Sequence, residues 1–347
     1  MPRHPTRKCA QALRPVPVLL TLAVLLAVVD GMLLASGQFS LDVAGYLRLC
    51  LLGLVLLGAG RVYTSLRPDP RLAAMLFGTG FLCLFSLEAS VLNYLLLPHT
   101  GPRIDEMLAA LDRAMGFDWP AAMRVMAVHP LLNAAALFAY SSMLPQVALL
   151  TIVLGSTEPA RVYRFILAIA LSALACIAVW SLAPSFGAFS VYPAPPRMAL
   201  ALDWAYAQDL VRLLHDGPGF ISPHDARGLI GFPSYHAALA LLVIWFARAN
   251  ALLRWPALLL NLAVLAATPL QGGHHLVDVL GAVPVTALAL LLVSRLHAEK
   301  DVKAASMVNK GPRISNEWVS TPPFCSALEQ KPESRPSAIK RKLKAVL

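Results

Sequence analysis

Residues 165–182 read FILAIALSALACIAVWSL and contain no charged side chain over eighteen positions. A helix needs about 20 largely apolar residues to cross the hydrocarbon core of a bilayer. Seven more apolar runs of this kind lie at 16–35, 44–59, 72–96, 131–154, 234–246, 255–270 and 274–296. The pattern therefore predicts an all-α fold, a polytopic transmembrane helical bundle of about eight spans.

The composition of the 347 residues also indicates a bilayer environment. Hydrophobic residues make up 58% of the chain and charged residues only 14%, which is more apolar than a soluble domain with a wetted surface. The formal net charge is +10, but charges at the ends of apolar runs record membrane orientation and do not indicate a nucleic-acid partner. The five cysteines lack the spacing of a disulfide framework or a zinc site.

Basic residues indicate the orientation of the predicted spans. Segment 1–15 carries four of them, which also fits the front of a signal peptide, but the apolar run that follows is long for a signal and no clear cleavage site ends it. We therefore expect a retained first helix with 1–15 in the cytoplasm. Alternation then places these residues in cytoplasmic connections: Arg61, Arg67, Arg71, Arg161, Arg164, Arg248 and Arg254. The connections 97–130 and 183–233, each with three arginines against four acids, fall on the outer side.

The predicted membrane domain spans 16–297 and includes two outer segments. Apolar positions in IDEMLAALDRAM recur at helical spacing with acids in the first turn, which predicts an amphipathic helix over about 104–128 on the outer face. Residues 183–233 form the predicted outer loop. Residues 298–347 are rich in Lys, Arg, Ser and Pro with few aromatics, so we expect a disordered, basic, cytoplasmic tail.

The first candidate for chemistry is His236, in the sequence Gly-Phe-Pro-Ser-Tyr-His at 231–236. Pro233 and Ser234 occupy helix-start positions directly before an apolar run, so the imidazole lies in the first turn of a helix. A helix N-terminus binds anions through its unpaired N–H groups and its dipole. The alternative is that these residues form an ordinary capped helix start with no role in chemistry.

The second candidate is the pair His274 and Asp278, four residues apart at the start of the last run. This spacing places both side chains on one helical face, where a carboxylate can fix the imidazole tautomer and leave the other nitrogen nucleophilic. Interfacial histidines that merely tolerate wet and apolar surroundings are the alternative. A metal or haem on His274 and His275 lacks a third convergent ligand, so we expect no metal and no cofactor.

These elements resemble the type 2 phosphatidic acid phosphatase superfamily, which is related to vanadium haloperoxidases. That family shows Pro-Ser-x-His and, one hairpin later, Ser-Arg followed by five residues and His-x-x-x-Asp. The resemblance implies a six-helix phosphatase-like core. It also implies that His274 is the nucleophile, Asp278 its orienting partner and His236 the acid that protonates the leaving group. Ser234 and backbone amides, that of Gly273 among them, would hold phosphate oxygens.

The sequence departs from the family pattern in its cations. Ala267 and Thr268 stand where the family has Ser-Arg, and no lysine occurs between Lys8 and Lys300. The stretch 183–187, Ala-Pro-Ser-Phe-Gly, is similar to the divergent branch that includes inositol phosphorylceramide synthases. The cationic clamp on phosphate would then come from the outer loop, whose arginines are Arg197, Arg212 and Arg227.

The resemblance predicts an enzyme, a lipid phosphate phosphatase or headgroup phosphotransferase, that acts through a phosphohistidine. Its partners would be the membrane and a lipid phosphate, and its site would be extracytoplasmic, with both termini in the cytoplasm. The alternative from another class is a non-catalytic lipid-binding or transport protein on the same scaffold.

Overall fold

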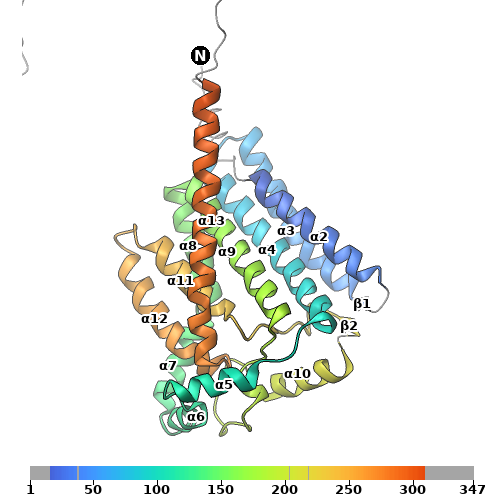
Figure 1. Ribbon diagram of the computed structural model, residues 1–347. Coiled ribbons are helices and arrows are strands. Elements are labelled where there is room, and N and C mark those ends of the chain that lie inside the picture. Colours follow the sequence, from blue (N-terminus) through green and yellow to red (C-terminus); the bar gives the residue numbers. More distant parts are fainter. Residues whose placement is uncertain (1–15, 37–38, 203, 218, 309–347) are drawn as a thin grey trace, which may run out of the picture. The chain divides into compact units, whose positions relative to one another are not determined.

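The computed structural model describes residues 16–36, 39–202, 204–217 and 219–308, so the predicted cytoplasmic segment 1–15 lies outside it. The helices are α2 Val16–Leu34, α3 Val43–Ser65, α4 Pro70–Leu96, α5 Asp105–Ala114, α6 Trp119–Val128, α7 Pro130–Ser141, α8 Met143–Thr157, α9 Pro159–Leu182, α10 Trp204–Asp216, α11 Tyr235–Ala247, α12 Arg254–Gln271 and α13 Leu276–Val308. Two short 3₁₀ turns, η1 Leu97–His99 and η2 Ala188–Ser190, and the two-residue strands β1 Ser40–Leu41 and β2 Phe220–Ile221 complete the order. The prediction of an all-α polytopic helical bundle is confirmed (Figure 1).

Helix α9 is central to the bundle because it is apolar on every side. It packs against α4, α8 and α11. Among the candidate membrane spans of the described residues, α9 has the largest share of buried residues. Helix α4 also packs against α2 and α3, while α11 packs against α12, which contacts α7. The start of α13 joins this core through Val279 and Ala282, which contact Ala237 and Ala238 of α11.

Fewer helices than the eight predicted are long and apolar enough to cross a membrane. Within the described residues five helical segments meet both criteria: α2, α3, α4 with η1, α9, and 276–296 of α13. A sixth is reached if α6 and α7, bent by 112° at their junction, count as one broken span. The predicted run 131–154 is interrupted at Ser142 between α7 and α8, and 234–246 gives α11, only 13 residues long. At 1.5 Å per residue α11 is about 20 Å long, shorter than the hydrocarbon core.

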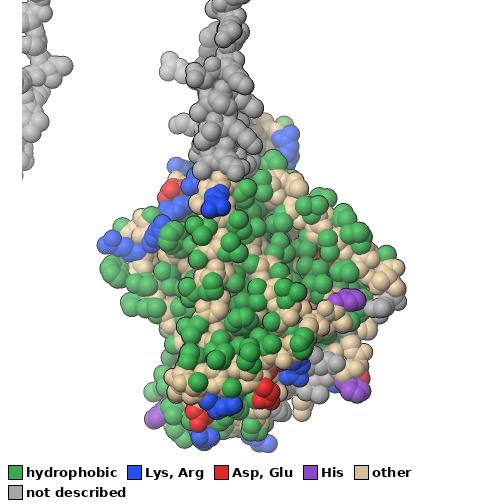
Figure 2. All heavy atoms as spheres, viewed as in Figure 1, with side chains coloured by type: hydrophobic (Ala, Val, Ile, Leu, Met, Phe, Trp, Pro, Cys, Tyr) green, Lys and Arg blue, Asp and Glu red, His purple; other side chains and the backbone are tan. Residues whose placement is uncertain are grey.

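The surface has the character of a membrane protein. Large hydrophobic side chains stand exposed along the helices, among them Leu47 and Leu51 of α3 and Leu291 of α13. Figure 2 shows a broad hydrophobic band with Arg side chains beyond it at both ends of the bundle. Several long apolar helices with such a band indicate an integral membrane protein.

The connections divide between the two ends of the bundle. The connections α3–α4, α8–α9 and α11–α12, which carry the basic residues predicted to be cytoplasmic, lie at one end (Figure 1). Helices α5, α6 and α10 lie across the other end, at the bottom of the view. The strands β1 and β2 pair in parallel, Ser40 with Phe220 and Leu41 with Ile221, and so tie the α2–α3 connection to the outer loop.

Two predicted boundaries differ from the structure. The helix predicted over 104–128 is divided into α5 and α6, because the chain turns at Gly116 with φ of +83° and Asp118 then caps α6 by accepting from Ala121 N at 2.9 Å. Helix α13 continues to Val308, past residue 298 where the sequence places the start of the tail. The remainder of that predicted tail, 309–347, lies outside the described residues.

Candidate active site

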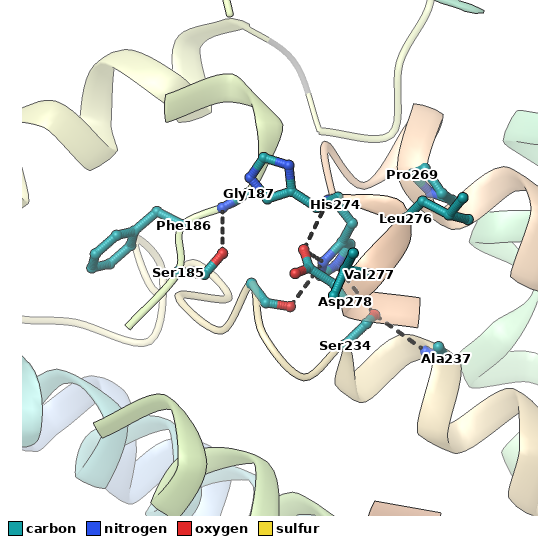
Figure 3. Close-up of polar contacts among 12 residues, drawn as sticks. Ser185, Phe186, Gly187, Ser234, Ala237, Pro269, His274, Leu276, Val277 and Asp278 are labelled. Carbon is teal, nitrogen blue, oxygen red and sulfur yellow. Dashed lines mark hydrogen bonds and ion pairs between the residues drawn. The ribbon is translucent and has the colours of Figure 1, made fainter. Parts of the chain in front are cut away.

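Three segments meet at the end of the bundle that carries α5, α6 and α10. They are the loop after α9, the loop before α11 and the loop between α12 and α13, and Figure 3 shows them converging. Backbone hydrogen bonds join them: Ala188 N donates to Gly273 O at 2.6 Å, Gly231 N to Ser185 O at 2.7 Å, and Ser234 N to Asp278 O at 2.9 Å. The site is thus fixed by main chain before any side chain is considered.

Glycine is required where these loops approach each other most closely. A Cβ on Gly187 would lie 2.2 Å from Gly273 O, and one on Gly231 would lie 2.5 Å from Ser185 O. Gly187 also has φ of +82°, a conformation that side chains other than glycine rarely adopt. Both positions therefore admit only glycine at this spacing.

His274 is held by two acceptors on one ring nitrogen. Its Nδ1 lies 3.1 Å from Gly231 O and 3.2 Å from Asp278 Oδ2. Because neither oxygen can donate, Nδ1 carries the hydrogen and Nε2 bears the lone pair. Nε2 lies 3.4 Å from the Oγ of Ser234. The geometry leaves the nitrogen that a nucleophile needs on the side of Ser234.

Asp278 is fully buried in the first turn of α13, and its Oδ2 serves two donors. Besides facing His274, it accepts from the backbone N of His275 at 2.8 Å. Ser234 is also fully buried and caps α11, accepting from Ala237 N at 3.4 Å. The predicted triplet Ser234, His274 and Asp278 is therefore brought together as one hydrogen-bonded chain (Figure 3).

His236 is the second residue of α11 and is held by Tyr140 in two ways. The rings stack with centroids 4.0 Å apart and an interplanar angle of 8°, and Nε2 lies 3.0 Å from Tyr140 O. The carbonyl can only accept, so Nε2–H donates to it and Nδ1 is the nitrogen that this contact leaves able to exchange a proton. His236 can act as a general acid once Nδ1 is protonated.

A cavity of about 260 Å³ opens beside these residues. His236 and His274 line it together with backbone of Gly187, Gly231 and Gly273 and with aromatic side chains. Among the described residues, none of those that line it is Lys, Arg, Asp or Glu. A phosphate there would be held by imidazoles, by amides such as that of Gly273, and by the first N–H groups of α11, which have no intrahelical acceptor.

The three outer-loop arginines are not brought to this cavity. Arg197 is exposed and lines neither cavity described here, whereas Arg212 and Arg227 line a second cavity of about 490 Å³. Asp209 pairs with both, and its Oδ2 lies 3.5 Å from the Arg227 guanidinium. In the structure as described, the cationic clamp predicted from these residues is separate from His274. The positions that replace the family Ser-Arg, Ala267 and Thr268, are buried within α12.

Sequence reasoning missed two aspartates of α5. Asp105 and Asp112 are 2% and 0% exposed, although the sequence suggests acids on an outer amphipathic helix. Asp105 Oδ1 accepts from Ser185 Oγ at 2.9 Å, Phe186 N at 2.8 Å and Gly187 N at 3.0 Å. Asp112 accepts from the first two amides of α13, Leu276 N at 2.9 Å and Val277 N at 3.0 Å. The sequence feature that could have indicated their burial is that Asp105 and Asp112 share one helix face with the apolar Leu108 and Ala109.

His275 lies between these aspartates. Its Nε2 is 3.8 Å from Asp105 Oδ1 and its Nδ1 is 3.6 Å from Asp112 Oδ2, so the contacts are ion pairs longer than hydrogen bonds. Burial opposes the charged ring, but the carboxylates prevail and raise the pKa of His275 from the usual 6.5 to about 9. Burial opposes the charge of Asp105 as well, yet its hydrogen bonds and Arg103 hold its pKa below the usual value. His275 is fully buried and does not line the cavity, so it is not placed to attack a substrate.

Among the described residues, no group of three or more His, Cys, Asp or Glu side chains is arranged to hold a metal ion. Whether the reaction proceeds without a metal stays a prediction.

Comparison with known proteins yields one match. The family model described as the PAP2 superfamily matches residues 106–292. No curated protein and no solved structure matches the chain.

Proposed function

The chain belongs to the PAP2 superfamily, a family of phosphatases and phosphotransferases, and we propose that it transfers phosphoryl groups from a lipid phosphate through a phosphohistidine on His274. The observation that carries this proposal is the tautomer of His274. Nδ1–H is held by Asp278 and Gly231 O, so the lone pair lies on Nε2, beside the cavity that also contains His236. This is the arrangement of an activated nucleophile with its orienting group.

The proposed reaction has two balanced steps. In the first, Nε2 of His274 forms a bond to phosphorus as the bond from phosphorus to the leaving oxygen breaks, and His236 gives its Nδ1 proton to that oxygen. In the second, His236 takes the proton from water or an acceptor hydroxyl, whose oxygen attacks phosphorus and releases His274. Asp278 stabilises the imidazole as it becomes positively charged. Water gives hydrolysis and a lipid hydroxyl gives headgroup transfer.

The lipid nature of the substrate is supported by the setting of the cavity. It lies at an end of a bundle whose flanks are hydrophobic, and its remaining lining includes Leu202 and Ile230 besides aromatic rings. A phosphate on a lipid would present its charge at this depth while its chains stay in the bilayer. The basic connections at the opposite end support a site on the extracytoplasmic side with the N-terminus and the end of the last span in the cytoplasm.

A non-catalytic lipid-binding protein is the alternative, and one observation favours it. Within the part of the chain that the structure describes, no Lys or Arg lines the cavity, whereas phosphoryl transfer depends strongly on positive charge near the transferred group. Turnover therefore decides between the two functions.

The test is phosphate release or headgroup transfer from short-chain phosphatidate by the purified full chain in proteoliposomes, compared among wild type, His274→Ala and His99→Ala. His99 is exposed, follows α4 and does not line the cavity, so it controls for loss of a histidine. We expect activity in wild type and His99→Ala and none in His274→Ala. Binding without turnover in wild type would support the non-catalytic alternative, and turnover in folded His274→Ala would exclude His274 as nucleophile.

A further inference from the structure

Helix α5 contacts two of the three segments that build the site, through two carboxylates on one face. Asp105 and Asp112 are seven residues apart, so they lie two turns from each other along the same side of the helix. Asp105 bonds to 185–187, where Phe186 and Gly187 line the cavity. Asp112 bonds to the start of α13, two and three residues after His274.

We propose that Asp105, His275 and Asp112 form a positioning clamp in which α5 fixes the loop 185–187 and the start of α13 relative to each other, so that His274 stays aligned with the cavity. The proposal rests on the proposed function, because the alignment matters only if His274 reacts. These three are positioning residues, since none of them lines the cavity.

The charges of the clamp explain why a buried histidine is needed. Two carboxylates at most 2% exposed would repel each other and resist burial, and the imidazolium of His275 between them offsets this. The other charged groups that face the cluster are Asp278, one turn into α13, and Arg103, whose Nε donates to Asp105 Oδ2 at 3.1 Å. Among the described groups that face these carboxylates, the imidazolium is therefore the only fully buried cation.

The clamp is also adjacent in sequence to the proposed nucleophile. His275 follows His274 directly, and its backbone N donates to the same Asp278 oxygen that holds His274 Nδ1. A shift of the His275 ring towards either aspartate would therefore be passed to both partners of the proposed nucleophilic pair. Because a misplacement of about 1 Å can cost about 10²-fold in rate, small movements here would be measurable.

The test measures the rate of phosphoenzyme formation in the full-length protein, divided by the number of active sites. The amplitude of the pre-steady-state burst gives that number. Asp112→Asn cannot accept from both Leu276 N and Val277 N, since one of its two terminal atoms is an amide nitrogen. We expect a rate lower by about ten- to a hundredfold and little change in KM. Glu106→Gln, an exposed neighbour on α5, is the control and should behave as wild type.

A double-mutant cycle separates the clamp from a merely structural role. His275→Gln removes the cation between the two buried carboxylates, so adding Asp112→Asn should raise the per-site rate of that variant although it lowers the rate of wild type. Independent losses that multiply in the double variant would overturn the clamp. If His275→Gln does not fold, Ser185→Ala, which removes one of the three hydrogen bonds to Asp105 Oδ1, should still lower the per-site rate severalfold.

The outcomes also distinguish the clamp from the function on which it rests. If Asp112→Asn and Ser185→Ala had the per-site rate of wild type while His274→Ala was inactive, the clamp would be overturned and the proposed function would stand. Turnover in folded His274→Ala would instead overturn the proposed function.

Discussion

Replacement of Asp278 by asparagine separates the charge of the orienting group from its shape. Asp278 Oδ2 lies 3.2 Å from Nδ1 of His274 and 2.8 Å from the backbone N of His275. An amide oxygen in the same place accepts both hydrogen bonds but carries no negative charge. The variant therefore tests whether the carboxylate charge contributes to the chemical step.

The magnitude follows from the separation of the two groups. At an effective dielectric constant of about 20, unit charges about 3 Å apart interact by roughly 5 kcal/mol. This is an upper bound for the stabilisation lost when His274 becomes positively charged on attack. If about half of it is expressed, at about 1.4 kcal/mol per tenfold, kcat falls by about 10²-fold. KM should change little, because the charge develops only as the bond to phosphorus forms.

The assay is steady-state and single-turnover kinetics in detergent with short-chain phosphatidate. Asp118→Asn is the matched control, since Asp118 is exposed, caps α6 and does not line the cavity. We expect its kcat to equal that of wild type. A wild-type kcat in correctly folded Asp278→Asn would refute the orienting role of Asp278.

Three further predictions concern the acid, the buried histidine and a loop glycine. His236→Ala should lower kcat about 10²- to 10⁴-fold for alkyl phosphates but far less for an aryl phosphate, whose leaving oxygen needs little protonation; equal losses on both substrates would contradict the assignment. The raised pKa of His275 implies stability that is complete below about pH 6.5 and lost as pH rises through about 9, amounting to about 3 kcal/mol. Melting temperatures of wild type in detergent should fall over that pH window. If the melting temperature of His275→Gln fell by the same amount, the pH dependence would belong to another group. Gly231→Ala, whose Cβ would lie 2.5 Å from Ser185 O, should lose both activity and about 1–3 kcal/mol of stability; Gly58→Ala, on α3 with open space around it and outside the cavity lining, is the control, and equal behaviour of the two would exclude the close approach as the cause.

The parts of the site that local spacing determines could be predicted from the sequence. The spacing of four residues from His274 to Asp278 places both side chains on one helical face, and Pro233 and Ser234 mark the start of α11. The structure brings His236 and His274 to one cavity, as expected from two helix starts joined by a helical hairpin. These features depend on helix periodicity and capping, which are local properties of the chain.

The parts that depend on distant partners could not be predicted. The aspartates of α5 contact backbone amides about 80 and 160 residues further along the chain, and periodicity does not reveal whether a polar face meets water or protein. The span count of eight depends on hydropathy, which does not detect the interruption at Ser142 and which counts the run 234–246 as a span although α11 has only 13 residues. The expectation that outer-loop arginines reach the phosphate likewise needs long-range geometry, and Asp209 pairs with two of them instead.

The most direct test of the central proposal is chemical identification of the phosphorylated residue. The full-length protein is mixed with radiolabelled short-chain lipid phosphate, quenched within the burst, digested and analysed by mass spectrometry. We predict an acid-labile, base-stable phosphohistidine on the peptide that contains His274, absent in His274→Ala and formed more slowly in Asp278→Asn. An acid-stable phosphoserine at Ser234, or turnover with no phosphoenzyme at any residue, would contradict it.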